Sequence, residues 1–397
     1  MGWFEEATRR RTAEIREQGR WRTIRTLRAG GTTTTVTATG EPVVQFASND
    51  YLGLSMHPDV ADAAARAAKE TGFGSGASRL VVGSRREHER LEDALARWKR
   101  PDLEDSAALL FPTGYAANLG TLGAVGAAAA ATAGGSGKAL VLSDELNHAS
   151  IIDGTRLSRL PVEVYPHLDL AELDSRLAAR SGAPSVVVSD VVFSMDGDVL
   201  DVAAMSSICA RHGALLVLDV AHDVFDAASE VVDGADVLVV GTLSKSLGSL
   251  GGYVVGSRAA IEMVLNTARP FIFSTATPPP VAAAAAAALA IETSAEGARR
   301  RARLRDNIDR LRPGHPSPII PVVIGDDNEA MEVSAALLEQ GLLVPAIRPP
   351  TVPAGTSRLR VALCALHTRG QIDMLSDALA ELGHPVGAGG AASDGPA

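Results

Sequence analysis

Short aliphatic runs alternate with helical stretches through the middle of the chain, between a helix expected over residues 87–99 and about residue 256. Six such runs of four to six residues occur, at 108–111, 139–143, 162–165, 185–189, 214–219 and 237–241. Short, mostly aliphatic runs of this length are typical of strands buried on both faces. The alternation therefore predicts an α/β fold with a mostly parallel sheet and helices on both of its faces.

The two ends of the chain have a different pattern. Residues 3–18 have helical periodicity, residues 33–39 and 43–46 form a hairpin pattern, and residues 48–54 form a polar loop with no internal reason to be structured. Beyond residue 290 a helix, a strand, another helix and two apolar runs are expected, at 299–312, 319–324, 328–340, 343–347 and 359–363. We therefore expect an N-terminal helix and hairpin segment (1–50), a large domain (51–290), a small α+β C-terminal domain (291–384) and a disordered tail (385–397).

Composition excludes several classes of protein. The 397 residues are 46% hydrophobic and 21% charged, with a formal net charge of -10, which argues against a nucleic-acid partner. No apolar run is long enough to predict a membrane span. Cys209 and Cys364 lie in apolar periodic segments, so we expect free buried thiols in a reducing compartment, the cytoplasm.

One lysine has an unusual position. Of the four lysines, Lys69 and Lys99 lie in charge-rich helical segments and Lys138 follows a Gly/Ser loop, so all three are expected on the surface. Lys245 instead follows the buried run 237–241, where desolvation would lower the pKa of its amine and make it a nucleophile and base. The alternative is a phosphate-contacting lysine, but the G-x-x-x-x-G-K-[ST] spacing of that motif is absent.

Polar residues follow the other runs, at the edge of a parallel sheet where ligands bind. They are Gly114, Tyr115, Asn118, Asp144, His148, Asp190, Ser194, Asp219, His222 and Thr242. Together with Lys245 they provide the groups that pyridoxal 5′-phosphate (PLP) needs. Asp219 is the candidate to keep the pyridine nitrogen protonated and His222 to donate to the phenolic oxygen, while His148 would lie over the ring. Gly114, Tyr115, Ser194 and Thr242 are candidates for the phosphate site. No metal is expected.

Eight stretches, in order, resemble the α-oxoamine synthase family of fold-type-I PLP enzymes over roughly residues 3–384. They are FASNDYLGL (46–54), GSGASR (74–79), FPTGYAAN (111–118), NHAS (147–150), FSMDGD (193–198), TLSK (242–245), FIFST (271–275) and AIRPPTVPAGTSRLR (346–360). The last stretch most resembles the members that condense a pimeloyl thioester with L-alanine in biotin synthesis.

The resemblance implies a role for each matching position. Lys245 would bind PLP covalently and then move the α-proton of the amino acid, with His148, Asp219 and His222 as its catalytic partners. Ser274 and Thr275 would complete the phosphate site of a neighbouring subunit in a homodimer. Arg360 would hold the amino-acid carboxylate, and Arg22, Asn49, His148 and Thr351 would also meet substrate. The expected reaction joins an amino acid to an acyl thioester, carried by CoA or a carrier protein, with loss of CO2.

Two departures from the family pattern leave alternatives open. Asp223 stands where the family has glycine, and the segment from His222 to Lys245 is shorter than usual. A carboxylate at Asp223 is expected to raise the pKa of His222. The alternatives are a relative that uses glycine or another acyl thioester, such as 2-amino-3-ketobutyrate CoA ligase, and a degenerate protein that binds PLP without turnover.

Overall fold

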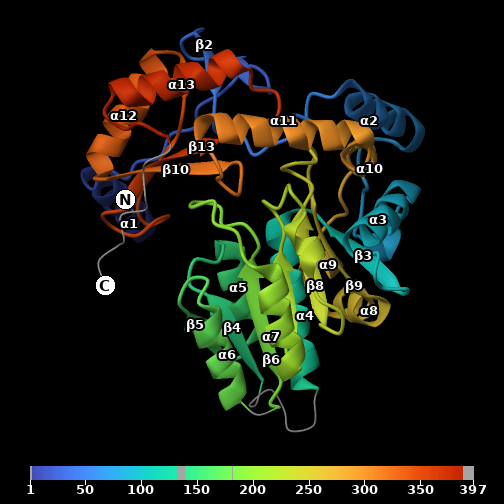
Figure 1. Ribbon diagram of the computed structural model, residues 1–397. Helices are drawn as coiled ribbons and strands as arrows, with labels where there is room; N and C mark the ends of the chain where they lie inside the picture. Colours follow the sequence, from blue (N-terminus) through green and yellow to red (C-terminus); the bar gives the residue numbers. More distant parts are fainter. Residues whose placement is uncertain (1, 132–138, 181, 388–397) are drawn as a thin grey trace.

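A seven-stranded sheet forms the centre of the larger part of the molecule (Figure 1). The structure is a computed structural model and describes residues 2–131, 139–180 and 182–387. The strands are β3 (Ser106–Phe111), β4 (Leu140–Asp144), β5 (Val162–Tyr165), β6 (Ser185–Asp190), β7 (Leu215–Asp219), β8 (Val237–Thr242) and β9 (Gly252–Ser257). Their order is β3-β9-β8-β7-β6-β4-β5, and only β9 runs antiparallel to its neighbours.

Helices cover both faces of this sheet because alternate residues of each strand point to opposite sides. Val186, Val188 and Val217 pack with α4 (Gly114–Ala130), α5 (Ala149–Ser158) and α8 (Arg258–Thr267). Val187, Leu216 and Leu218 face the other way. They share a cluster with residues of α3 (Arg86–Lys99), α6 (Leu170–Ala179), α7 (Val202–His212) and α10 (Pro279–Glu292). The sheet is therefore packed between two layers of helices, as the aliphatic runs predict.

The C-terminal part is smaller and holds a second sheet, in the order β10-β13-β12. Its strands are β10 (Ile319–Gly325), β12 (Ala346–Ile347) and β13 (Ser357–Ala362). The helices of this part are α11 (Ala295–Leu311), α12 (Asp327–Glu339) and α13 (Arg369–Glu381). Figure 1 shows α11 lying across the top of the larger part, so the carboxyl ends of the central strands face the smaller one.

The N-terminal segment joins the C-terminal part. After α1 (Trp3–Glu17), strand β1 (Thr33–Thr35) pairs antiparallel with β2 (Pro42–Gln45). β2 then pairs in parallel with β11 (Leu342–Leu343) to form a third sheet. Helix α2 (Pro58–Thr71) and the turn η1 (Arg79–Gly83) lead from there into the larger part.

The predicted fold class is confirmed: all six expected strands occur in a mostly parallel sheet, next to a smaller sheet near the C-terminus. Strand β9 was not predicted. Residues 48–54 form a loop, as expected, but the loop is not polar throughout, because Tyr51, Leu52 and Leu54 are fully buried in the core. Of the expected tail, residues 388–397 lie outside the described residues.

Within the described ranges, no single helix is both long and apolar enough to cross a membrane. The bent pair α10 and α11 passes such a test by length and composition only when the two helices are taken together.

Candidate active site

Lys245 lies just beyond the carboxyl end of β8, as predicted. Its Nζ is 2.8 Å from Nε2 of His222. Burial lowers the pKa of Lys245 to about 8, against the opposing influence of Asp219 and Asp190. An amine with this pKa is partly neutral near physiological pH and is therefore available as a nucleophile or base.

Two carboxylates end the adjacent strands β6 and β7 in the same register. Asp219 accepts hydrogen bonds from Asn118 Nδ2 at 2.6 Å and from the Ala221 N–H at 2.9 Å. Asp190 accepts from the backbone N–H of His148 at 2.7 Å. Burial, together with the charge of Asp219, raises the pKa of Asp190 well above its usual range. The two carboxyl groups therefore differ: Asp219 is held by two hydrogen bonds, whereas buried Asp190 takes up a proton more readily than an ordinary aspartate.

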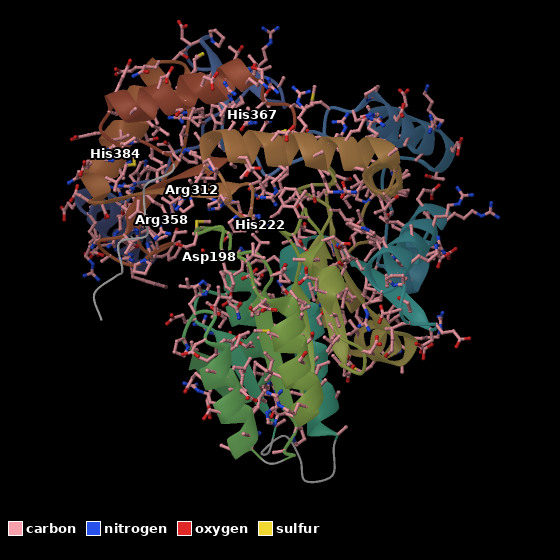
Figure 2. All side chains as sticks on the ribbon, in the orientation of Figure 1. Asp198, His222, Arg312, Arg358, His367 and His384 are labelled. Carbon is pink, nitrogen blue, oxygen red and sulfur yellow. The ribbon has the colours of Figure 1, made fainter. Side chains whose placement is uncertain are left out.

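His222 is buried between Lys245 and Tyr51 (its position is labelled in Figure 2). Its Nδ1 lies 2.6 Å from the Tyr51 hydroxyl. Burial, followed by the charges of Lys245 and Arg360, lowers the pKa of His222 well below its usual range, so the ring is neutral.

The expected effect of Asp223 on His222 is wrong. The Asp223 carboxylate turns away and accepts hydrogen bonds from the N–H groups of Ala227 at 2.8 Å and Ala228 at 2.9 Å. It thus caps the short 3-10 turn η3 (Ala227–Glu230).

Lys99 fixes the same loop and is not the surface residue that its helical, charge-rich segment predicted. Its side chain is only 2% exposed and donates to Asp226 at 2.8 Å. The ammonium also lies over the Trp98 ring, 3.8 Å from the centroid.

The start of α4 lies beside Thr242. A Cβ added to Gly114 would be 3.1 Å from Cβ of Thr242, so the missing side chain is what allows the helix terminus to approach the end of β8. The Thr242 hydroxyl donates to the Gly251 carbonyl at 2.9 Å and lies 2.7 Å from Ser244 Oγ. The N–H groups of a helix start next to hydroxyls suit a phosphate.

His148 and Tyr115 stand over the same region. His148 is the N-cap of α5, and its ring forms an edge contact with Tyr115 at 6.4 Å between centroids. Tyr115 is half exposed and its hydroxyl donates to Asp153. The His148 ring is therefore positioned by its own helix, through Ser150.

Arg360, on β13, reaches from the smaller part into the site. Its Nη2 donates to Asn49 Oδ1 at 3.1 Å, and its Nε donates to the carbonyl of Ser194. The structure thus brings together three of the predicted residues, Arg360, Asn49 and Ser194.

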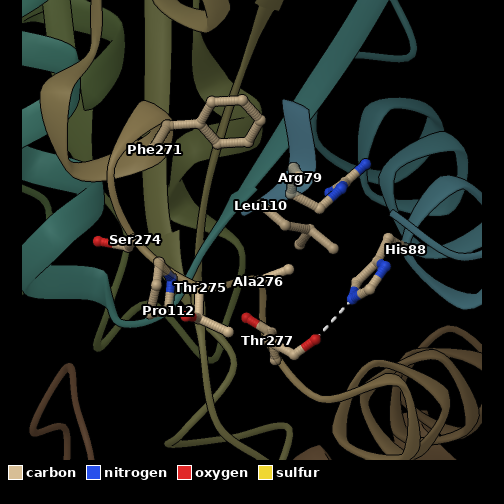
Figure 3. A pocket seen from close by; sticks show the side chains of 9 residues that line it. All are labelled: Arg79, His88, Leu110, Pro112, Phe271, Ser274, Thr275, Ala276 and Thr277. Atoms are coloured by element: carbon tan, nitrogen blue, oxygen red, sulfur yellow. Dashed lines mark hydrogen bonds between the residues drawn. The ribbon is translucent and has the colours of Figure 1, made fainter. Parts of the chain in front are cut away.

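Two pairs of predicted residues lie elsewhere. Arg22 and Thr351 line one hollow of about 410 Å³, together with Arg20, Arg25 and Arg348. Ser274 and Thr275 line a cavity of about 10 Å³ with Arg79, His88 and Pro112 (Figure 3). Figure 3 shows His88 pointing to the backbone carbonyl of Thr277, which it contacts at 2.6 Å.

Tyr51 is a site residue that sequence reasoning missed. It lies in the stretch expected to be a polar loop with no internal reason to be structured, yet its hydroxyl contacts both Asn49 and His222. The signal available in the sequence was an aromatic residue directly after three polar ones, Ser48, Asn49 and Asp50.

A family model for aminotransferases of class I and II matches residues 41–379. The chain belongs to the aminotransferase class I and II family. Among curated proteins it is 44% identical to an 8-amino-7-oxononanoate synthase of Janthinobacterium sp. (strain Marseille) over 362 residues, which cover 86% of this chain and 89% of the relative.

Solved structures of this aminotransferase family agree with that relationship. A structure of SPT with a PLP internal aldimine is 29% identical, with a TM-score of 0.83, and the match covers 96% of this chain and 100% of that one. An 8-amino-7-oxononanoate synthase from Francisella tularensis shares the fold, with 24% identity, a TM-score of 0.69 and coverage of 86% and 96%. The predictions of the α-oxoamine synthase family, an enzyme and a PLP cofactor are confirmed.

The described residues fit PLP. Gly114 lies close to Thr242, which places the N-terminus of α4 at the site. The Asp219 carboxylate accepts a hydrogen bond from Asn118. Lys245 supplies an amine of lowered pKa next to His222. Among the residues described, no group of three or more His, Cys, Asp or Glu side chains is placed to hold a metal ion.

Proposed function

We propose that this enzyme condenses L-alanine with a pimeloyl thioester to give 8-amino-7-oxononanoate, CO2 and the free thiol, a step of biotin synthesis. The observation that carries the proposal is the 44% identity to an 8-amino-7-oxononanoate synthase along 86% of the chain. The contact between Lys245 and His222 beside Asp219 supplies the matching chemistry.

PLP, when bound, would supply an electron sink for the negative charge that develops on the α-carbon of the amino acid. Lys245 would hold the cofactor covalently and, once free, take the α-proton on Nζ. Asp219 would keep the cofactor nitrogen protonated, and His222 would donate from its ring to the phenolic oxygen. His148 would cover the ring.

The remaining residues would bind and orient. Gly114, Tyr115, Ser194 and Thr242 would serve the cofactor phosphate and its surroundings. Arg360, assisted by Asn49, would bind the amino-acid carboxylate through its planar guanidinium. Arg22 and Thr351 would meet the acyl donor in the 410 Å³ hollow, whose arginines suit an acidic group.

We further propose that the enzyme is a homodimer. Ser274 and Thr275 follow Phe273, which is 69% exposed, and Val81 and Val82 on the neighbouring turn η1 are 72% and 67% exposed. A second copy of the chain would pack against this apolar surface. The packing would bring Ser274 and Thr275 to the phosphate site of the other copy. The free thiols of Cys209 and Cys364 agree with the reducing cytoplasm.

Borohydride trapping and a substrate panel test the proposal. Reduction of the holoenzyme should label only the peptide that contains Lys245, and Lys245→Ala should lose the label and at least about a thousandfold in CO2 release. The panel compares alanine with glycine, and pimeloyl-CoA with the pimeloyl carrier protein and other acyl thioesters. A label on another lysine, or faster turnover with glycine or a different acyl group, would overturn the assignment. A label without turnover would indicate the degenerate binder.

A further inference from the structure

Two buried arginines of β13 reach the same loop of the larger part. Arg358 and Arg360 are two positions apart on the strand, so both side chains leave the same face of the small sheet. Arg358 Nη1 donates to the Asp196 carboxylate, and Arg360 Nε donates to the Ser194 carbonyl. The loop after β6 thus contacts, at two neighbouring points, the strand that carries the proposed carboxylate-binding arginine.

Gly197 brings this loop onto the backbone of the small sheet. Its φ is +76°, and a Cβ added there would overlap the Ile319 carbonyl on β10. A residue with a side chain would therefore move the loop away from the strand. Within the loop, the Phe193 N–H donates to the Asp198 carbonyl at 3.0 Å, and the Gly197 N–H donates to the Phe193 carbonyl at 2.8 Å. Residues 193–198 therefore form a tight turn that contacts the smaller part.

The direction of the Arg360 guanidinium depends on this turn. The Ser194 carbonyl accepts from Nε, and Asn49 Oδ1 accepts from Nη2 at 3.1 Å. A guanidinium is planar and carries five N–H groups, so two fixed acceptors set the direction of the remaining groups. Because the Ser194 acceptor is a backbone atom, its position follows that of the turn. The contacts that hold the turn against β13 therefore also direct the N–H groups that a carboxylate would meet.

We propose that Asp196 and Arg358 are positioning residues that hold the Ser194 carbonyl where it orients Arg360 toward the amino-acid carboxylate. Their side chains are 28% and 6% exposed, so the ion pair is screened less than one on the surface. Neither side chain needs to touch the substrate. The inference rests on the proposed function for the role of Arg360, whereas the orientation of Arg360 is a property of the chain alone.

Binding of alanine and of alaninamide to the holoenzyme tests the inference, with the visible absorbance of the cofactor as the signal. Alaninamide keeps the amine and the methyl group of alanine and lacks the carboxylate. Asp196→Ala should raise the Kd for alanine about tenfold, as the loss of one hydrogen bond implies, and leave the Kd for alaninamide unchanged. Arg358→Met should have the same effect. Asp196→Asn keeps an accepting oxygen and should bring the alanine Kd within about threefold of the wild type.

Two comparisons separate positioning from a general loss of structure. Asp373→Ala removes a carboxylate from another arginine pair of the smaller part, which joins α13 to Arg310 of α11, and should change neither Kd. In an Arg360→Met background, Asp196→Ala should have no further effect on alanine binding, because both residues act through one contact. Equal weakening of alanine and alaninamide, or an additive effect in the Arg360→Met background, overturns the inference.

The direction of Arg360 can also be measured without substrate. In NMR spectra of the full-length protein, isotope-labelled at its arginines, the Arg360 Nε–H signal is assigned by its absence from Arg360→Lys. This hydrogen should exchange with water about tenfold faster in Asp196→Ala than in the wild type, and at the wild-type rate in Asp373→Ala. An unchanged exchange rate in Asp196→Ala overturns the positioning role. If wild-type holoenzyme gives no absorbance change with alanine, the proposed function fails, and the exchange rate still decides the positioning role.

Discussion

At the scale of single residues, neighbouring carboxyl groups at the ends of β6 and β7 have different environments. Asp219 receives hydrogen bonds on both oxygens, from Asn118 and Ala221. Asp190 is fully buried next to it, and burial raises its pKa well above the usual range. Two negative charges side by side repel, so the protonated form of Asp190 is favoured more than in an isolated aspartate.

This difference predicts that the same change, aspartate to asparagine, has a small effect on turnover at position 190 and a large effect at position 219. Asp190→Asn should keep PLP affinity and turnover within about threefold, because an amide has the shape of the carboxyl group and its oxygen still accepts from His148 N–H. Asp219→Asn should lower turnover by about a hundredfold or more, because a fixed charge is lost. Absorbance titration with PLP and steady-state kinetics measure both. Equal losses of PLP affinity and turnover in the two variants would contradict this difference between Asp190 and Asp219.

The sequence predicts the residues that follow strands and misses those fixed only by tertiary contacts. Lys245, Asp219 and His222 are recognisable because a buried run precedes each of them. Tyr51 is not, because its environment is formed by residues 49, 222 and 365, which come together only in the folded chain. The charge effect expected of Asp223 fails for a similar reason, since adjacency in sequence does not set the direction of a side chain.

At the scale of elements, the loop after β6 is held from two sides. Asp198 in this loop faces His167, and Asp196 pairs with the buried Arg358 of β13 (Figure 2 labels Asp198 and Arg358). His167 also bonds to Asp144 at 3.0 Å and lies edge-on to Phe193. The loop that carries Ser194 is thus fixed to both parts of the molecule.

The contacts of His167 with Asp144 and Asp198 predict that the free energy of unfolding depends on pH. Burial lowers the pKa of His167, but the hydrogen bonds to Asp144 and Asp198 outweigh it and raise the pKa to about 9. The folded pKa lies above the unfolded value of about 6.5, so the stabilisation is complete below pH 6.5 and is lost as the pH rises through 9.

His167→Gln should therefore lower the free energy of unfolding by up to about 3 kcal/mol at pH 6, and by much less at pH 10. Urea unfolding at several pH values measures this difference. His212→Gln, which removes a partner from an Asp174 also held by Arg211, is the control and should cost less. A loss of unfolding free energy that does not vary with pH would contradict this role of His167.

Element positions follow the hydrophobic pattern closely where strands are parallel and buried. Strand β9 escaped prediction because it follows a glycine-rich segment and inserts antiparallel between β3 and β8, a pairing that only the folded sheet determines. The apolar run expected at residues 343–347 divides into β11 and β12, which belong to different sheets.

At the scale of the whole molecule, the exposed apolar surface around η1 and Phe273 predicts self-association. Val81→Asp places a charge where we expect a second copy to pack, and should convert dimers to monomers and weaken PLP binding. Light scattering with size-exclusion chromatography measures the mass. Val164→Asp, a 56% exposed position on the opposite edge strand β5, is the matched control. A wild-type mass in both variants would contradict this interface.

The pairing of β2 with β11 has a consequence for synthesis on the ribosome. Val44 finds its partner Leu342 only after most of the chain has been translated, so the β1–β2 hairpin emerges early with one edge unsatisfied. We expect the nascent chain to need protection of that edge, by a chaperone or by rapid collapse, until its last third leaves the exit tunnel.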